Sequence, residues 1–136
     1  MISWSSEYET GVASVDADHR RLMEGLNELE QALSSGSGSR RIGEVLAFLA
    51  SYAADHFARE EACMNRFNCP TAIANKAAHR DFIIKFTAAQ SRIEKSPNSA
   101  ALIALQVHRE LSDWIVNHIL RIDSALKTCA PKGARL

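Results

Sequence analysis

The sequence predicts an all-α protein: an up-down-up-down antiparallel four-helix bundle with an ordered N-terminal arm. Apolar residues recur at intervals of three and four along four long segments, as on the buried face of a helix. Apolar-polar alternation with period two, which would indicate strands, is not sustained anywhere in the chain. The breaks between the segments are short, and short connections make sequential helices antiparallel neighbours. We therefore expect one domain over residues 1–128, followed by a tail or linker over residues 129–136.

The N-terminal arm is predicted over residues 1–15, where Trp4 and Tyr8 occur without sustained helical periodicity. We expect these aromatic side chains to lie over the bundle. Asp16 is the predicted N-cap of the first helix, because an aspartate accepts hydrogen bonds from the free N–H groups of a first turn. That helix has leucines along one face and ends at the Ser/Gly segment 34–39.

The other three helices are bounded by similar breaks. The second is predicted from about Arg40 to Arg66 and ends at the corner Asn68-Cys69-Pro70. The third starts near Thr71 and ends before segment 96–98, which contains a proline. The fourth carries its apolar stripe as far as Leu126.

Composition excludes several classes of partner. Sixteen basic residues balance sixteen acidic ones without a basic cluster, which argues against nucleic acid or an anionic membrane surface. No apolar run approaches the roughly 18 residues of a membrane span, so we expect no membrane insertion. The three cysteines are irregularly spaced and do not indicate a disulfide framework, which fits a reducing cytoplasm. A redox pair of Cys63 and Cys69 is possible in principle, but we expect separate thiols.

Polar side chains interrupt the apolar stripe of every helix. Burying such groups without partners would cost several kcal/mol, so something must satisfy them. Each lies near the start of an odd-numbered helix or toward the end of an even-numbered one, and alternating helix directions bring these positions to the same end of the bundle. The residues are His19, His56, Glu60, Asn75, His79 and His118.

This set of donors indicates a metal site. One buried histidine is usually hydrogen-bonded to the protein, but several at matched depth cannot all satisfy one another, whereas a metal uses every lone pair. Asp123 follows His118 by five residues, about 140° round an ideal helix, so spacing alone fits a ligand and a surface aspartate equally. His108 falls beside the stripe and is predicted to lie at the surface. With Asp123 included, the donors suit two metal ions bridged by carboxylates.

The order of these residues resembles that of the hemerythrin family, in its bacterial branch. His19, His56-x-x-x-Glu60, His79 and His118-x-x-x-x-Asp123 follow the family pattern from Trp4 to about Leu126. The resemblance implies two iron ions in a non-haem, oxo- or hydroxo-bridged centre, with dioxygen as ligand. It implies that Glu60 and Asp123 bridge the irons, that His19 and His56 hold the oxygen-binding iron, and that His79 and His118 hold the other.

The resemblance also implies an apolar oxygen pocket. Phe57, Ile115 and Ile119 correspond to its lining, whereas Leu22 and Trp114 are expected in the general core.

One position departs from the family pattern. The family usually has a second histidine four residues before the one matched by His79, and this chain has Asn75 there. Asparagine offers only a weak amide oxygen, or it holds a water in the vacated position. Either way we expect the second iron to gain an exchangeable site, which favours autoxidation and the binding of small anions.

These features predict an oxygen or redox sensor rather than an enzyme. Similar domains are input modules of signal transduction, linked to an output domain such as a diguanylate cyclase or a chemotaxis receptor. A free-standing oxygen carrier or store is the alternative, and a peroxidase-like oxidoreductase is a third reading. Beyond the donors, only Glu61 and Tyr8 offer a general acid or base, and Glu61 is expected to be solvated or to support a ligand.

Overall fold

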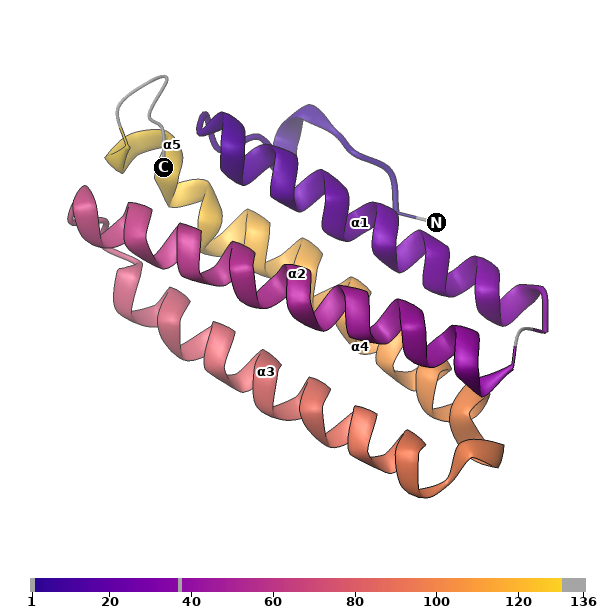
Figure 1. Cartoon of the computed structure of the whole chain (residues 1–136). Helices are drawn as coiled ribbons and strands as arrows, with labels where there is room; N and C mark the ends of the chain where they lie inside the picture. The colour runs from indigo at the N-terminus through magenta and orange to yellow at the C-terminus, as the bar shows by residue number, and fades with distance from the viewer. Residues whose placement is uncertain (1, 37, 131–136) are drawn as a thin grey trace.

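The computed structural model describes residues 2–36 and 38–130, and four long helices dominate it. They are α1 (Ala13–Ser34), α2 (Ser39–Arg66), α3 (Ala72–Lys95) and α4 (Ala100–Arg121). Each helix packs against the next, and α4 closes the bundle against α1 (Figure 1). A short 3-10 turn, η2 (Pro97–Ser99), joins α3 to α4. The predicted all-α four-helix bundle is confirmed, and no strand occurs among the described residues.

The N-terminal segment runs back along the outside of α1, as Figure 1 shows. It contains one 3-10 turn, η1 (Ser6–Tyr8). The backbone N–H of Ile2 donates to the Asn27 side chain at 3.0 Å, and the Asn27 amide donates to the Ile2 carbonyl at 2.9 Å. The Arg20 guanidinium lies 4.7 Å from the centre of the Trp4 ring. The segment is therefore an ordered arm, anchored along its length to α1.

The predicted N-cap of α1 is wrong. The helix begins at Ala13, with Val12 in the cap position, so Asp16 already lies within its first turns. The Asp16 carboxylate accepts instead from the backbone N–H and the hydroxyl of Thr10, both at 2.8 Å. Gly11 between them has φ +85°, which lets the arm turn sharply into the helix. Asp16 therefore ties the arm to α1 rather than capping the helix.

The fourth helix ends earlier than its apolar stripe predicts. After Arg121 the chain forms a 3-10 turn, η3 (Asp123–Ala125), and a short helix, α5 (Leu126–Cys129). The Ile122 carbonyl accepts from the Ala125 N–H at 3.1 Å and from the Thr71 hydroxyl at 3.3 Å. This i to i+3 bonding tightens the backbone at that point. The prediction that the fourth helix continues to Leu126 is therefore wrong.

The expectation of separate thiols is also wrong for two of the three cysteines. Cys69, at the corner between α2 and α3, forms a disulfide with Cys129 at the end of α5, and their Cα atoms are 5.3 Å apart. Cys63 is buried and free, so the alternative pairing of Cys63 with Cys69 is excluded as well. The bundle brings together cysteines that are 60 residues apart in sequence. Because two of the three cysteines form a disulfide, cysteine usage no longer favours a reducing compartment, and a cytoplasmic location stays a prediction. Residues 131–136 of the predicted tail lie outside the described residues.

The core has two apolar clusters. The larger runs along the bundle from the loop between α1 and α2, and includes Leu29, Ile42 and Ile103. The smaller closes the opposite end and contains Val12, Val15, Cys63, Met64, Cys69 and Leu126.

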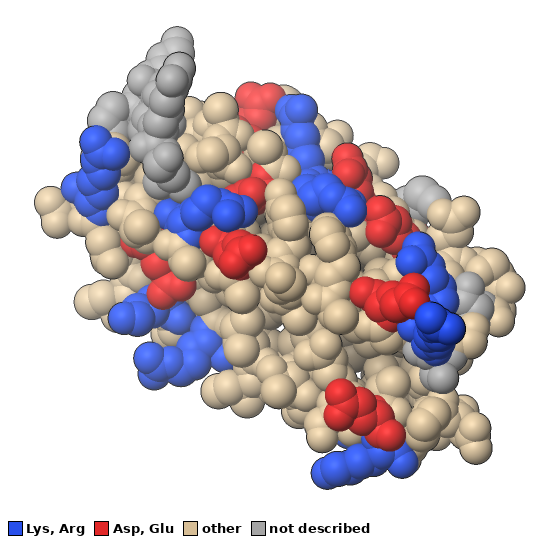
Figure 2. All heavy atoms as spheres, in the orientation of Figure 1, with Lys and Arg blue, Asp and Glu red and all other residues tan. Residues whose placement is uncertain are grey.

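The charged surface is mixed. On the face shown in Figure 2, acidic and basic side chains are interspersed. None of the helices among the described residues has both the length and the apolar character that crossing a membrane requires.

Candidate metal centre

The structure brings all seven predicted donors together between the two apolar clusters. None has more than 6% of its surface exposed, and Glu60, Asn75 and Asp123 are 0% exposed. They come from α1, α2, α3, α4 and the turn after α4. The donors are His19, His56, Glu60, Asn75, His79, His118 and Asp123.

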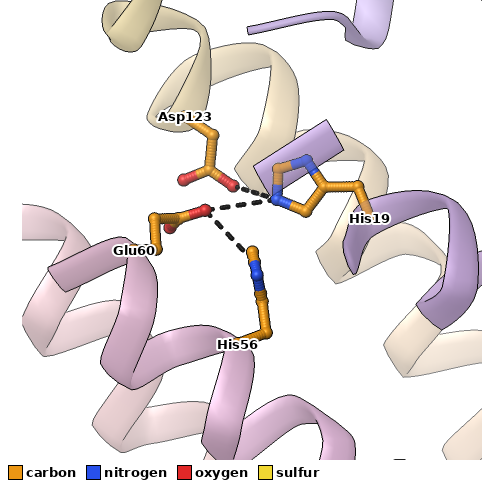
Figure 3. Close-up of side chains that lie close together, drawn as sticks. All are labelled: His19, His56, Glu60 and Asp123. Carbon is orange, nitrogen blue, oxygen red and sulfur yellow. Dashed lines mark hydrogen bonds and ion pairs between the residues drawn. The ribbon is translucent and has the colours of Figure 1, made fainter. Parts of the chain in front are cut away.

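One group of donors contains His19, His56, Glu60 and Asp123 (Figure 3). Oε2 of Glu60 lies 3.2 Å from Nε2 of both histidines. Oδ2 of Asp123 lies 3.0 Å from Nε2 of His19. One donor atom from each of the four side chains lies within 4.8 Å of the others, which is the spacing of ligands around a single ion.

A second group shares both carboxylates with the first. Oε1 of Glu60 lies 3.1 Å from Nε2 of His79, and Oδ1 of Asp123 lies 3.2 Å from Nε2 of His118. The Asn75 side chain joins this group, with Oδ1 2.8 Å from Nε2 of His118. Each carboxylate therefore presents one oxygen to each group, as a bridge between two ions requires.

Asp123 reaches both groups because α4 ends before it. On a continued helix its side chain would lie on the flank of the bundle. The 3-10 turn after Ile122 redirects the chain, and the Asp123 carboxylate faces His19 and Glu60 (Figure 3). The end of α4 at Arg121, which apolar periodicity does not predict, therefore brings Asp123 into the site.

Protons alone cannot satisfy this cluster. Nε2 of His118 lies within 3.8 Å of four polar atoms but can donate only one hydrogen bond. Nε2 of His79 is one of these four, at 3.1 Å. Both Asp123 oxygens, Oε1 of Glu60 and Nδ2 of Asn75 are buried without a hydrogen bond. Such atoms cost free energy unless something else binds them. Imidazole and carboxylate donors in this arrangement fit two metal ions.

Without metal, the histidines and carboxylates of the cluster stabilise one another's charged forms. Burial alone would lower the pKa of His19 and of His118, but the nearby carboxylates of Asp123 and Glu60 raise both to about 9. Burial would raise the pKa of Glu60, but the surrounding imidazoles hold it well below its usual range. A metal must therefore displace protons from His19 and His118 at neutral pH, so protons compete with metal binding.

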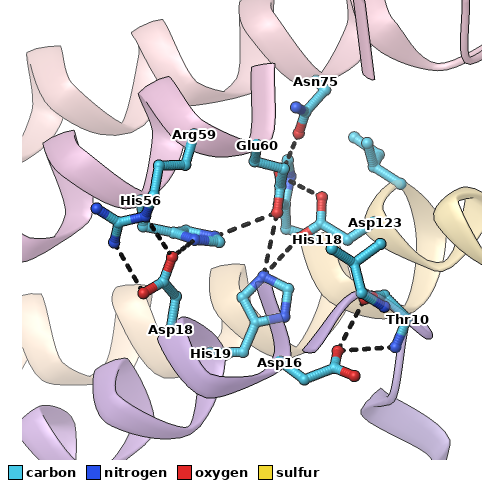
Figure 4. Close-up of polar contacts among 12 residues, drawn as sticks. Thr10, Asp16, Asp18, His19, His56, Arg59, Glu60, Asn75, His118 and Asp123 are labelled. Carbon is cyan, nitrogen blue, oxygen red and sulfur yellow. Dashed lines mark hydrogen bonds and ion pairs between the residues drawn. The ribbon is translucent and has the colours of Figure 1, made fainter. Parts of the chain in front are cut away.

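Asp18 orients His56, a role that helical spacing does not predict. Its Oδ2 lies 3.0 Å from Nδ1 of His56, and because a carboxylate only accepts, Nδ1 carries a proton and Nε2 faces Glu60. Arg59 donates to both oxygens of Asp18, at 2.9 and 2.8 Å (Figure 4). The Tyr52 hydroxyl donates to Oδ1 of Asp18 at 3.0 Å. Burial would raise the pKa of Asp18, but the bonds from His56 and Arg59 lower it, so the carboxylate stays ionised. Its only sequence signal was its position beside His19, one step off the stripe.

His79 has a weaker partner of the same kind. Oε2 of Glu61 lies 3.4 Å from Nδ1 of His79, and the Phe57 ring stacks on the imidazole at 3.9 Å between centroids. Glu61 therefore supports a donor, which is one of the two roles expected for it. His108 lies outside both groups, and it is half-buried rather than exposed as predicted.

A small cavity of about 10 Å³ is lined by three donors of the first group, His19, His56 and Asp123, and also by His118 of the second. This volume holds about one water-sized molecule. The three predicted residues, Phe57, Ile115 and Ile119, line it. Leu22 and Trp114 line it as well, which corrects their assignment to the general core alone. Helical periodicity predicts that Leu22 and Trp114 lie on buried faces, but it cannot show that a cavity remains between those side chains.

Known proteins are similar to this chain in sequence and in architecture. Residues 10–130 match the family model described as "Hemerythrin HHE cation binding domain". The chain is 30% identical to a bacteriohemerythrin of Stenotrophomonas maltophilia (strain R551-3), over 92% of this chain and 78% of the relative. It is 27% identical to a bacteriohemerythrin of Methylococcus capsulatus (strain ATCC 33009 / NCIMB 11132 / Bath), over 95% and 96% of the two chains.

A crystal structure of wild-type hemerythrin superposes with a TM-score of 0.81, at 25% sequence identity, and covers 95% of this chain and 97% of that one. The family model extends over nearly all the described residues and includes every donor of the cluster. The chain belongs to the hemerythrin family.

Proposed function

We propose that this protein binds two iron ions and, through them, dioxygen. The observation that carries the proposal is the sharing of Glu60 and Asp123 between two groups of imidazoles. Glu60 and Asp123 would bridge the ions, with His19 and His56 on one and His79 and His118 on the other. Bound iron would supply the redox chemistry that dioxygen binding needs. Iron analysis of protein produced with ample iron tests the stoichiometry, and about two ions per chain is the expected result.

The cavity supports dioxygen as the ligand of the His19 and His56 side. Its free volume of about 10 Å³ holds about one very small molecule, and apart from the donors its walls are apolar. Among the described residues that line it, no acid or base is present apart from the donors themselves. Without a positioned proton donor, binding is favoured over turnover, so we infer that the protein is not an enzyme.

We further propose that the protein senses oxygen or redox state and passes the signal to a linked or associated output domain. Asn75 supports this reading, because its amide oxygen is a poorer ligand than an imidazole and would leave an exchangeable position for water or a small anion. A centre open on both sides oxidises readily, and a sensor can use its oxidation state as the signal. A carrier or store fits the fold equally, and the lifetime of the dioxygen complex separates the two: hours indicate carriage, and seconds to minutes indicate sensing.

Replacing Asn75 by histidine tests this interpretation. The variant should lengthen the lifetime of the dioxygen complex by about tenfold, equivalent to about 1.4 kcal/mol in the barrier to oxidation. Stopped-flow absorption after mixing the reduced protein with oxygenated buffer measures the lifetime. Asn117→His, at an exposed position of α4, is the matched control and should leave it unchanged. An Asn75→His protein that oxidises as fast as the wild type would contradict the proposed role.

Replacing Asp18 by asparagine should weaken iron binding by about 10- to 100-fold, because His56 loses the carboxylate that orients it. Competition with a chromogenic chelator measures the affinity. Asp55→Asn, beside His56 but exposed, serves as the control. Equal affinities in the two variants would show that Asp18 does not position the ligand.

A further inference from the structure

A groove of about 380 Å³ lies on the surface between α2 and α3 and reaches the metal centre from outside. Its floor includes His79 and Phe57, whose rings stack on each other. The groove is distinct from the small cavity, because it lies against the second group of donors and lacks His19 and His56. A molecule in this groove would touch a predicted ligand of the second iron without occupying the dioxygen site.

The two ends of the groove differ in chemistry. Because α2 and α3 are antiparallel, Glu61 lies level with the first turns of α3, which contribute Lys76 and Arg80. At the other end the walls are apolar, with Ala54 facing Ile83 and Ile84. Ile84 is 61% exposed and extends the apolar surface of this end toward solvent. The groove therefore has a charged end beside the metal centre and an apolar end away from it.

The charged end favours an anion. Lys76 and Arg80 are exposed, one turn apart on α3, and neither forms an ion pair among the described residues. By contrast, Lys85 further along α3 pairs with Asp81 at 3.1 Å. The Glu61 carboxylate also lines this end, where it contacts His79 at 3.4 Å, so one negative charge stands against two positive ones. In Figure 2 basic side chains lie at the lower left of the view, where Figure 1 shows α3 beginning, with acidic side chains beside them.

We propose that this groove binds a small monocarboxylate with an apolar tail, of the medium-chain fatty acid type. The carboxylate would lie between Lys76 and Arg80, and the tail would lie along Ala54, Ile83 and Ile84. The volume is at the lower end of the roughly 300–1,000 Å³ typical of small-molecule sites and suits about ten heavy atoms. The occupant would press on Phe57 and Glu61, the two side chains that hold the His79 ring. Because the His79 ring is a predicted ligand of the second iron, the occupant would regulate that iron; this role rests on the proposed function.

Calorimetric titration of the iron-loaded full chain with octanoate tests the binding site. One octanoate per chain is expected, and Lys76→Gln/Arg80→Gln should weaken binding by about tenfold. Arg92→Gln, exposed on the same helix outside the groove, should change the affinity by less than about twofold. Ala58→Leu, which fills the groove from α2, should abolish binding. Acetate and octylammonium, which lack the tail and the negative charge respectively, should not compete.

Several results would overturn the proposal: no saturable binding, equal affinity in the double variant and in Arg92→Gln, or competition by acetate, which would place the ligand on the metal itself. Coupling to the centre is read separately, as a shift of the visible absorption bands on saturation with octanoate, absent in Ala58→Leu. A missing shift would overturn the regulatory role. Iron content and the dioxygen complex are measured on the same sample. Octanoate binding without a dioxygen complex would therefore disprove the proposed function while leaving the groove established.

Discussion

Exchanging Glu60 for glutamine is expected to reduce bound iron from about two ions per chain to less than about one. Glu60 is 0% exposed and presents one oxygen to each group of donors. An amide keeps the size of the side chain but loses the negative charge, and its nitrogen is not a ligand. The change therefore weakens both sites at once. Iron analysis after gel filtration under reducing, anaerobic conditions measures the loss.

The control for this variant is Glu44→Gln, on the same helix but paired with arginines at the surface. It should keep the full iron content, and circular dichroism should show that both variants are helical. If the Glu60→Gln protein retained about two irons, Glu60 would not be the bridging ligand.

Replacing Cys129 by serine should lower the free energy of unfolding of the iron-free protein by about 4 kcal/mol, because the disulfide to Cys69 closes a loop of 60 residues. The cross-link restricts the unfolded chain, and its loss makes unfolding more favourable. Urea denaturation of chelator-treated protein measures the effect. Reduction of the wild-type disulfide should lower the unfolding midpoint to that of the variant.

Cys63→Ala is the matched control, since Cys63 is buried in the same apolar cluster but forms no disulfide. It should cost much less than Cys129→Ser. Identical unfolding midpoints for the oxidised wild type and for Cys129→Ser would contradict the predicted stabilisation. The variant should also release iron faster, because the disulfide anchors the segment that follows Asp123.

The bundle and most of its donor set could be predicted from the sequence. Helical periodicity identifies the buried face of each helix, and antiparallel packing converts position along a helix into depth in the bundle. These two rules suffice to bring His19, His56 and His118 to the same end. They also place Asn75, because it lies on the apolar stripe of α3, one turn before His79.

Three features do not follow from helical spacing, although the family resemblance already pointed to Asp123 as a ligand. Asp123 faces the centre because the backbone leaves the α-helix at Ile122, and a local change of hydrogen bonding leaves no trace in apolar spacing. Asp18 lies beside the stripe, where most aspartates are solvated, and only the approach of α2 makes it a partner of His56. The disulfide joins distant cysteines, whose pairing depends on how the two ends of the chain meet.

The separation of the apolar clusters has a consequence for how the protein is made. The larger cluster takes apolar side chains from all four helices, so we expect the bundle to assemble around it before any metal arrives. Folding and metal loading then become successive events rather than one. A newly synthesised chain would fold into an iron-free bundle with a preformed site. The iron supply of the cell, rather than the folding of the chain, would then set how many molecules become active.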